Sequence, residues 1–294
     1  MSGKFIARSR CRLLCAAGMF ALAAAVFGAA CGPRPPRLRI ATTTSVDSSG
    51  LLDTLVPGFE QEHGVNLQVL AVGSGQAFQL GRRGDVALLV THEPAGERAL
   101  ISDGLVRYYR KFMFNRFVIA GPPEDPAAAR GAASASEAMS RIARSGRLFV
   151  SRGDDSGTHA RERQLWAMAG VSPQPAHLIE TGQGMAPTLR VASQRVAYVL
   201  TDEATLARLA DAVQLRVIYD NDPALLNTYA VMILTTAPAR TSELADRFAR
   251  WIAEGGGRQH IDAFRIGTRQ VFFLWPAGLD AASPESTPAG VRAP

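Results

Sequence analysis

The sequence predicts an α/β protein built on parallel-rich mixed sheets. Short apolar segments of strand length alternate along the chain with longer segments that carry apolar residues at helical spacing. Turns rich in glycine, serine and threonine separate these segments. The 294 residues are 47% hydrophobic and 20% charged, which is typical of a globular chain with one large domain or two smaller ones. This alternation favours helices packed on parallel strands.

The first half of the chain body shows the alternation clearly. Strands are predicted at 38–41, 66–72 and 85–90, and a long extended segment at 107–120. A helix is expected to open at 48–50 and to carry its apolar face as far as Phe59. Pro57 should kink that helix or end it early. Two further helices are expected at 74–80 and 94–102.

The second half repeats the pattern. Strands are predicted at 148–150, 177–179, 196–200, 215–219 and 229–235. Helices are predicted at 136–144, 158–168, 186–193, 203–210 and 242–264, the last with a break at the three glycines 255–257. The residues from Pro276 onward are rich in alanine, proline and serine, so we expect them to be disordered.

The N-terminus has the pattern of an export signal. A basic region at 4–12 precedes an apolar run at 13–30, and small residues at 28–30 come directly before Cys31. We therefore predict a signal peptide over residues 1–30, a lipidated Cys31, and a proline-rich tether at 31–37. An ordinary cleaved signal and an uncleaved anchor are the alternatives, although the apolar run is barely long enough to span a bilayer.

Charge and cysteine content exclude several functions. The net charge is +6, but four of the 32 basic residues lie in the first 30 positions, which hold no acidic residue. The body is nearly neutral, so a charge-driven nucleic-acid binder is not expected. The three cysteines are Cys11, Cys15 and Cys31, which leaves no disulfide, thiolate metal site or cysteine nucleophile for the body. We expect neither a cofactor nor a metal.

The segment 151–159, Ser-Arg-Gly-Asp-Asp-Ser-Gly-Thr-His, carries the strongest functional signal. It joins a predicted strand to a predicted helix, where free N–H groups and the helix dipole favour an anion. Arg152 adds a fork of donors, while Ser156 and Thr158 add hydroxyls. Because carboxylates repel anions, at least one of Asp154 and Asp155 should point away, capping the helix or orienting Arg152.

Weaker signals of the same kind follow other strands, at 42–45, 73–76 and 182–185. Each has an alternative interpretation as ordinary turn or helix-cap chemistry. Ser156, His159 and an aspartate could also be read as a hydrolase triad, but no G-x-S-x-G elbow is present. The remaining histidines, at 63, 92, 177 and 260, lack ligand spacing and are expected to be surface or capped residues.

Together these segments resemble the substrate-binding component of a tungstate (TupA-type) ABC importer. The resemblance runs from Leu38 to about Pro276 and rests on the order and spacing of several motifs. They lie at 41–45, 49–52, 72–77, 83–86, 115–122, 151–159, 180–185 and 222–227. The family implies a type II periplasmic binding fold, in which two lobes hold an oxyanion between them.

The resemblance also implies lobe boundaries and a ligand site. Lobe 1 would take residues 38–115 and 229–282, lobe 2 residues 116–228, and a disordered tail 283–294, with crossings near Asn115 and Tyr229. The ligand donors would be Thr43, Thr44, Ser45, Ser74, Arg152, Ser156, Gly157 and Thr158.

The function that the resemblance implies is binding and delivery, not catalysis. A monomer on the outer face of the cytoplasmic membrane would capture tungstate and pass it to an ABC permease. Molybdate, phosphate and sulfate remain alternative ligands, and a partner of a membrane signalling protein remains an alternative role. Only phosphate is readily separable, because it carries a proton at neutral pH and benefits from a carboxylate acceptor.

Overall fold

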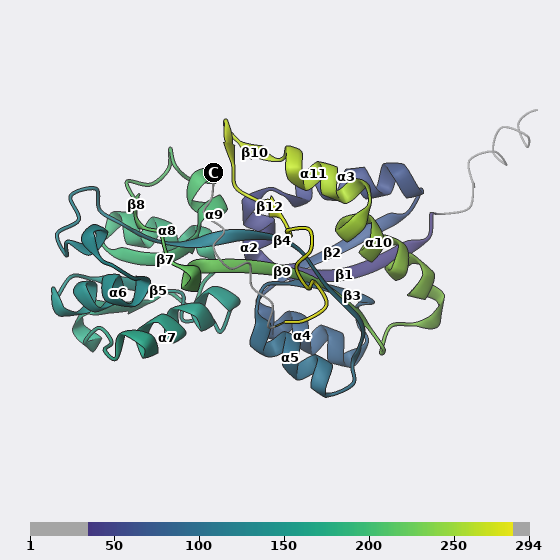
Figure 1. The fold of residues 1–294 in the computed structure, drawn as a ribbon, viewed down its shortest axis with the longest axis horizontal. Coiled ribbons are helices and arrows are strands. Elements are labelled where there is room, and N and C mark those ends of the chain that lie inside the picture. The colour runs from purple at the N-terminus through teal and green to yellow at the C-terminus, as the bar shows by residue number, and fades with distance from the viewer. Residues whose placement is uncertain (1–34, 285–294) are drawn as a thin grey trace, which may run out of the picture. The chain divides into compact units, whose positions relative to one another are not determined.

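The computed structural model describes residues 35–284. A mixed sheet of ten strands organises this part of the chain (Figure 1), in the order β2-β1-β3-β9-β4-β7-β5-β6, with β8 and β12 paired to β4. The predicted α/β class is confirmed. The predicted signal peptide, Cys31 and most of the tail lie outside the described residues. Within 35–284, no helix has both the length and the apolar character needed to cross a membrane.

The elements follow the predicted alternation closely. The strands are β1 (Arg37–Thr43), β2 (Asn66–Val72), β3 (Leu88–Thr91), β4 (Val106–Gly121), β5 (Phe149–Ser151), β6 (Leu178–Glu180), β7 (Tyr198–Asp202), β8 (Arg216–Tyr219), β9 (Leu226–Leu234), β10 (Arg265–Ile266), β11 (Arg269–Gln270) and β12 (Phe273–Leu274). The α-helices are α2 (Thr44–Ser49), α3 (Leu52–His63), α4 (Ser74–Arg83), α5 (Pro94–Ser102), α6 (Ala135–Arg144), α7 (Gly157–Ala169), α8 (Met185–Gln194), α9 (Glu203–Arg208), α10 (Ser242–Glu254) and α11 (Gly256–Ala263).

We call lobe 1 the half of the sheet formed by β1, β2, β3, β9 and β4 up to Arg116. Here β1 pairs in parallel with both β2 and β3, while β9 runs antiparallel to β3. Helices cover both faces: α3, α10 and α11 pack on one side, and α4 and α5 on the other (Figure 1). Burial on both faces explains why these strands are continuous apolar runs.

Lobe 2 is the half formed by β5, β6, β7, β8 and β4 from Phe117. In it β5 pairs in parallel with β6 and β7, and the end of β4 runs antiparallel to β7 and β8. Its core also has two layers. Helices α6 and α7 pack on one face around Phe149 and Trp166, and α8 and α9 pack on the other around Leu189.

Two strands connect the lobes. β4 changes its partner from β9 to β7 between Arg116 and Phe117, and β9 begins next to that point. Asn115 of β4 lies opposite Asn227 of β9, and the Asn227 Nδ2 donates to Asn115 Oδ1 at 2.7 Å. The crossings were expected in this region; the predicted residue boundaries of the lobes stay a prediction.

The first predicted helix is in fact two helices. The chain breaks at Gly50, which adopts the left-handed conformation with φ of 79° and caps α2. Of the two outcomes predicted for Pro57, an early end of the helix is wrong, since α3 continues to His63, while a kink stays a prediction. Phe59 is fully buried and packs edge-on against Phe248, with ring centroids 5.0 Å apart. This packing holds the helix despite the hydrogen bond that proline removes.

The expectation of disorder from Pro276 was wrong for residues 276–284. This segment returns to β4, where the Lys111 N–H donates to Ala281 O at 2.7 Å and Lys111 Nζ donates to Pro284 O at 2.8 Å. The same ammonium lies 5.1 Å above the ring of Trp275. A composition rich in proline and alanine did not reveal this contact, because its partner is a buried lysine 170 or so residues earlier in the chain.

Candidate functional site

The loops that follow the parallel strands of both lobes meet at one place. Parallel strands end at the same sheet edge, so the loops after β1, β2 and β3 converge, as do those after β5, β6 and β7. Direct contacts join the two groups of loops. Arg152 Nη1 donates to Ser45 Oγ (3.4 Å), Arg152 Nη2 donates to Thr44 Oγ1 (3.4 Å), and the Gly157 N–H donates to Ser74 Oγ (3.1 Å).

Arg152 is the centre of this cluster. It follows β5 directly and is 1% exposed, although it carries a full positive charge. Its Nη1 also lies 3.4 Å from Thr158 Oγ1, and its Nη2 forms an ion pair with Asp154. Its Nε has no hydrogen-bond partner among the described residues. The contacts to hydroxyls are long, so much of the hydrogen-bonding capacity of the guanidinium is unused.

Lobe 1 supplies hydroxyl groups from two helix starts. Thr43, Ser45 and Ser74 are all buried, and Thr44 is partly buried. The Thr43 Oγ1 has no partner among residues 35–284. Ser74 Oγ accepts the Gly157 N–H, which leaves its own hydrogen free to donate. These groups are neutral donors that can face an anion without adding charge.

Lobe 2 supplies the N-terminus of α7. Ser156 is its N-cap, and its Oγ accepts the His159 N–H at 3.3 Å. Thr158 is fully buried. Gly157 is closely packed: a Cβ there would lie 3.0 Å from His92 Cε1, so a larger residue would require the His92 ring to shift.

The two aspartates divide their roles as expected. One Asp154 oxygen pairs with Arg152, and the other accepts the Ser156 N–H at 3.2 Å. The Asp155 side chain is 81% exposed and pairs with Arg163, away from the cluster. Asp154 therefore orients the guanidinium, and Asp155 points into solvent.

The structure brings the predicted site residues together. Hydrogen bonds join Arg152 to Thr44, Ser45 and Thr158, and Gly157 to Ser74. Thr43, which is buried, directly precedes Thr44 in the chain. Ser156 belongs to the same loop as Arg152, with its hydroxyl committed to capping α7. Their role as ligand contacts stays a prediction.

Sequence reasoning missed three polar residues beside this cluster. His92, expected at the surface or in a cap, is instead 4% exposed, and neither ring nitrogen makes a hydrogen bond of full geometry among the described residues. Asn115 and Asn227 are buried below it, and each keeps one unpartnered side-chain atom within residues 35–284. One feature of the sequence could have indicated His92. It directly follows the buried strand β3, just as the predicted site residue Thr43 lies at the end of the buried strand β1.

The cluster is electropositive. Burial and the nearby guanidiniums of Arg152 and Arg161 lower the pKa of His92 to about 4, so its ring is neutral at pH 7. Burial raises the pKa of Asp202, and its carboxylate accepts both the N–H and the hydroxyl of Thr205. Within 35–284, no three His, Cys, Asp or Glu side chains are grouped so that they could hold a metal.

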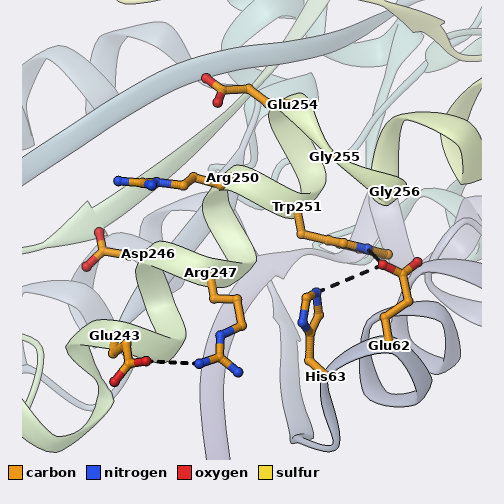
Figure 2. Close-up of a pocket in the computed structure, with 10 residues that line it drawn as sticks. All are labelled: Glu62, His63, Glu243, Asp246, Arg247, Arg250, Trp251, Glu254, Gly255 and Gly256. Carbon is orange, nitrogen blue, oxygen red and sulfur yellow. Dashed lines mark hydrogen bonds and ion pairs between the residues drawn. The ribbon is translucent and has the colours of Figure 1, made fainter.

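A separate surface cavity of about 690 Å³ lies between α3 and α10 (Figure 2). Four of its lining residues are acidic: Glu62, Glu243, Asp246 and Glu254. Arg247 pairs with Glu243, and the Trp251 Nε1 donates to Glu62. Asp246 and Glu254 pair with Arg107 and Arg110, which lie outside the lining. The acidic lining does not suit an anion.

The fold and the position of this cluster define a class of binding protein. The chain belongs to the PBP superfamily, the periplasmic binding proteins, because the PBP superfamily domain matches residues 29–255. Its architecture is that of type II members of this superfamily, as predicted.

Within that class the chain is similar to tungstate-binding proteins. It is 35% identical over 219 residues to the tungstate-binding protein TupA of Peptoclostridium acidaminophilum, which covers 72% of this chain and 76% of the relative. The structure of the tungstate ABC transporter from Geobacter sulfurreducens is 38% identical, with a TM-score of 0.71 over 78% of this chain and 98% of that one. TupA from Desulfovibrio alaskensis G20 is 35% identical, with a TM-score of 0.70 over 81% and 98%. The predicted resemblance is confirmed.

A buried carboxylate behind Arg152 gives a test of this part of the structure. Glu162 Oε2 accepts the Ser151 hydroxyl at 2.9 Å, and Oε1 accepts Trp166 Nε1 at 3.4 Å. Burial raises the pKa of Glu162 from 4.5 to about 7. Because the folded state then binds the proton more tightly, this group stabilises the fold below pH 4.5, and the stabilisation is lost as the pH rises through 7.

We predict that Glu162→Gln removes this pH dependence. Its free energy of unfolding, relative to the wild type, should rise by about 3 kcal/mol between pH 4.5 and pH 8. Urea denaturation of both proteins at the two pH values measures the difference. Glu243→Gln, at an exposed position, serves as the control. A Glu162→Gln difference that is the same at both pH values would contradict the prediction.

Proposed function

We propose that this protein binds a tetrahedral oxyanion, tungstate, at the junction of its lobes and delivers it to the permease of an ABC importer. The observation that carries the proposal is the buried guanidinium of Arg152, which faces hydroxyl groups from both lobes. Its relatives, which are tungstate-binding proteins, support the same ligand.

The chemistry of tungstate fits these groups. At neutral pH it is an unprotonated tetrahedral dianion, so its oxygens only accept hydrogen bonds. The site offers one buried guanidinium, several neutral hydroxyls and the N-terminus of α7. Because the donors belong to two lobes, only the closed arrangement completes the ligand's shell of contacts. A permease can then distinguish the loaded protein by its closed form.

The carboxylates disfavour a protonated oxyanion. Hydrogen phosphate needs an acceptor for its proton, but both oxygens of Asp154 already accept bonds, and Asp155 faces solvent. Asp202 is committed to Thr205. This arrangement favours tungstate, molybdate or sulfate over phosphate, and the relatives favour tungstate among these.

We further propose that the protein has no catalytic activity. The hydrolase alternative required Ser156 and His159 to act together. Instead, Ser156 Oγ accepts the backbone N–H of His159, and the His159 Nδ1 accepts the N–H of Asp155 at 3.1 Å. Both side chains are thereby engaged in ordering the start of α7, which supports a binding role over a nucleophilic one.

Calorimetric titration of the purified protein with tungstate, molybdate, sulfate and phosphate tests the proposed ligand. We expect tungstate to bind most tightly and to raise the melting temperature by several degrees at low micromolar concentration, because ligand stabilises only the folded form. EDTA should leave both effects unchanged, since no metal takes part. Tightest binding of phosphate, or no binding of any oxyanion, would contradict the proposal.

Substitution of Arg152 tests the residue assignment. Arg152→Lys keeps the charge but loses the fork, and should weaken tungstate binding by about 1–3 kcal/mol. Arg152→Ala should weaken it by about 3–5 kcal/mol, because Asp154 would then face the dianion without its partner. Arg163→Ala, which removes an exposed guanidinium from α7, the helix that follows the Arg152 loop, is the control. Wild-type affinity in folded Arg152→Ala would place the site elsewhere.

We also propose that the mature protein is an extracytoplasmic monomer held to the membrane by lipid on Cys31. The signal pattern before Cys31 and the family's role in import support this location. Intact-mass measurement of the protein purified from its native membrane should show a diacylated N-terminal Cys31, and Cys31→Ala should release the protein. An unmodified N-terminus at or after Cys31 would refute the lipid anchor.

A further inference from the structure

A buried histidine, His92, lies beside the proposed ligand contacts and is not among them. His92 follows β3, and its ring lies inside the junction at 4% exposure. Neither ring nitrogen makes a hydrogen bond of full geometry within residues 35–284, although the Asn227 side chain lies close enough to interact weakly with the ring. Leaving a buried polar group unpaired costs free energy, so a fold keeps such a group where it serves a function.

The ring is held in a fixed place by both lobes. It packs on Tyr229, with ring centroids 5.0 Å apart, and lies 6.1 Å from the ring of Phe117. Its Nδ1–Cε1 edge faces Gly157 of the opposite lobe: a Cβ at Gly157 would lie 3.2 Å from His92 Nδ1 and 3.3 Å from Ser74 Oγ. His92 and Ser74 therefore converge on the start of α7.

The surroundings of the ring favour an anion. Burial is the main cause of the lowered pKa of His92, and Arg152, from the loop after β5, and Arg161, from α7, are close enough to lower it further, while a weak hydrogen-bonding interaction with the Asn227 side chain of β9 raises it. Tyr229 of β9 stays neutral, because burial raises its pKa well above the usual value. The neutral imidazole keeps one N–H donor and one acceptor, and two guanidiniums attract a negative partner to it.

We infer that His92 is a further contact residue for the oxyanion and donates the N–H of its Nδ1 to it, an inference that rests on the proposed function. The imidazole would complete, from the end of β3, the ring of neutral donors that Thr43 and Ser74 begin from the ends of β1 and β2. Only the C-terminal edge of the lobe 1 sheet brings these three residues together.

Three substitutions at this position test the inference by titration with sodium tungstate. His92→Asn places an amide nitrogen where Nδ1 lies and should keep the affinity within about fivefold. His92→Gln has a longer side chain, which places its amide nitrogen beyond the position of Nδ1. His92→Phe keeps a ring of similar shape but has no hydrogen-bond donor. Both should bind tungstate about 10- to 100-fold more weakly. The control, His177→Phe, makes the same change outside the junction.

Thermal melting of the ligand-free proteins separates ligand contact from a structural role. Because His92→Phe replaces unpaired nitrogens with carbon, its ligand-free melting temperature should equal or exceed that of the wild type. Unchanged tungstate affinity in His92→Phe, or equal affinities in the Asn and Gln variants, overturns the inference alone. Loss of both affinity and ligand-free stability in all three variants also overturns it. If His92→Phe does not fold, the Asn and Gln pair decides. A wild-type protein that binds no oxyanion overturns the proposed function and this inference with it.

Discussion

The Arg152 guanidinium is buried between the two lobes, and the arrangement of the polar groups around it depends on that burial. A charge removed from water must be matched by other groups, and the protein matches this one only in part. Asp154 takes one nitrogen, the hydroxyls of Thr44, Ser45 and Thr158 lie at the long distance of 3.4 Å, and Nε has no partner among the described residues. The incomplete match leaves hydrogen-bonding capacity and positive charge for an anion.

The apolar cores that stabilise the fold and the polar groups around Arg152 lie in different parts of the molecule. Each lobe has its own apolar core on both faces of its sheet, and these cores reach the junction through Tyr229 and Phe117, which pack beside His92. Most of the unpartnered buried polar atoms of residues 35–284 lie instead where the lobes meet, on Thr43, His92, Asn115, Arg152 and Asn227; the others are on His63 and Tyr108. The apolar cores can therefore offset the free energy that the unpartnered polar groups of the junction cost. The strands β4 and β9 connect the lobes beside these groups. Burial also lowers the pKa of His92, so its ring adds no charge to the junction at neutral pH.

The sequence predicted local features with a local physical cause. Apolar runs and helix caps placed nearly every strand and helix, and strand–turn–helix segments containing serine, threonine and arginine pointed to the loops that meet at the junction. The break at Gly50 and the continuation of α3 through Pro57 were not predictable in this way. The first depends on the left-handed turn that caps α2, and the second on packing of Phe59 against a helix almost 190 residues away.

By itself the sequence determined the α/β class, the alternation of elements, the neutral body and the donor-rich loops, because each follows from residue type and short-range spacing. Only the tertiary structure decided which donors meet. It separated Asp154 from Asp155, buried His92 beside Arg152, and opposed Asn115 to Asn227. It also brought residues 276–284 back to Lys111. These outcomes depend on strand order and on contacts between residues distant in sequence, and no local pattern encodes them.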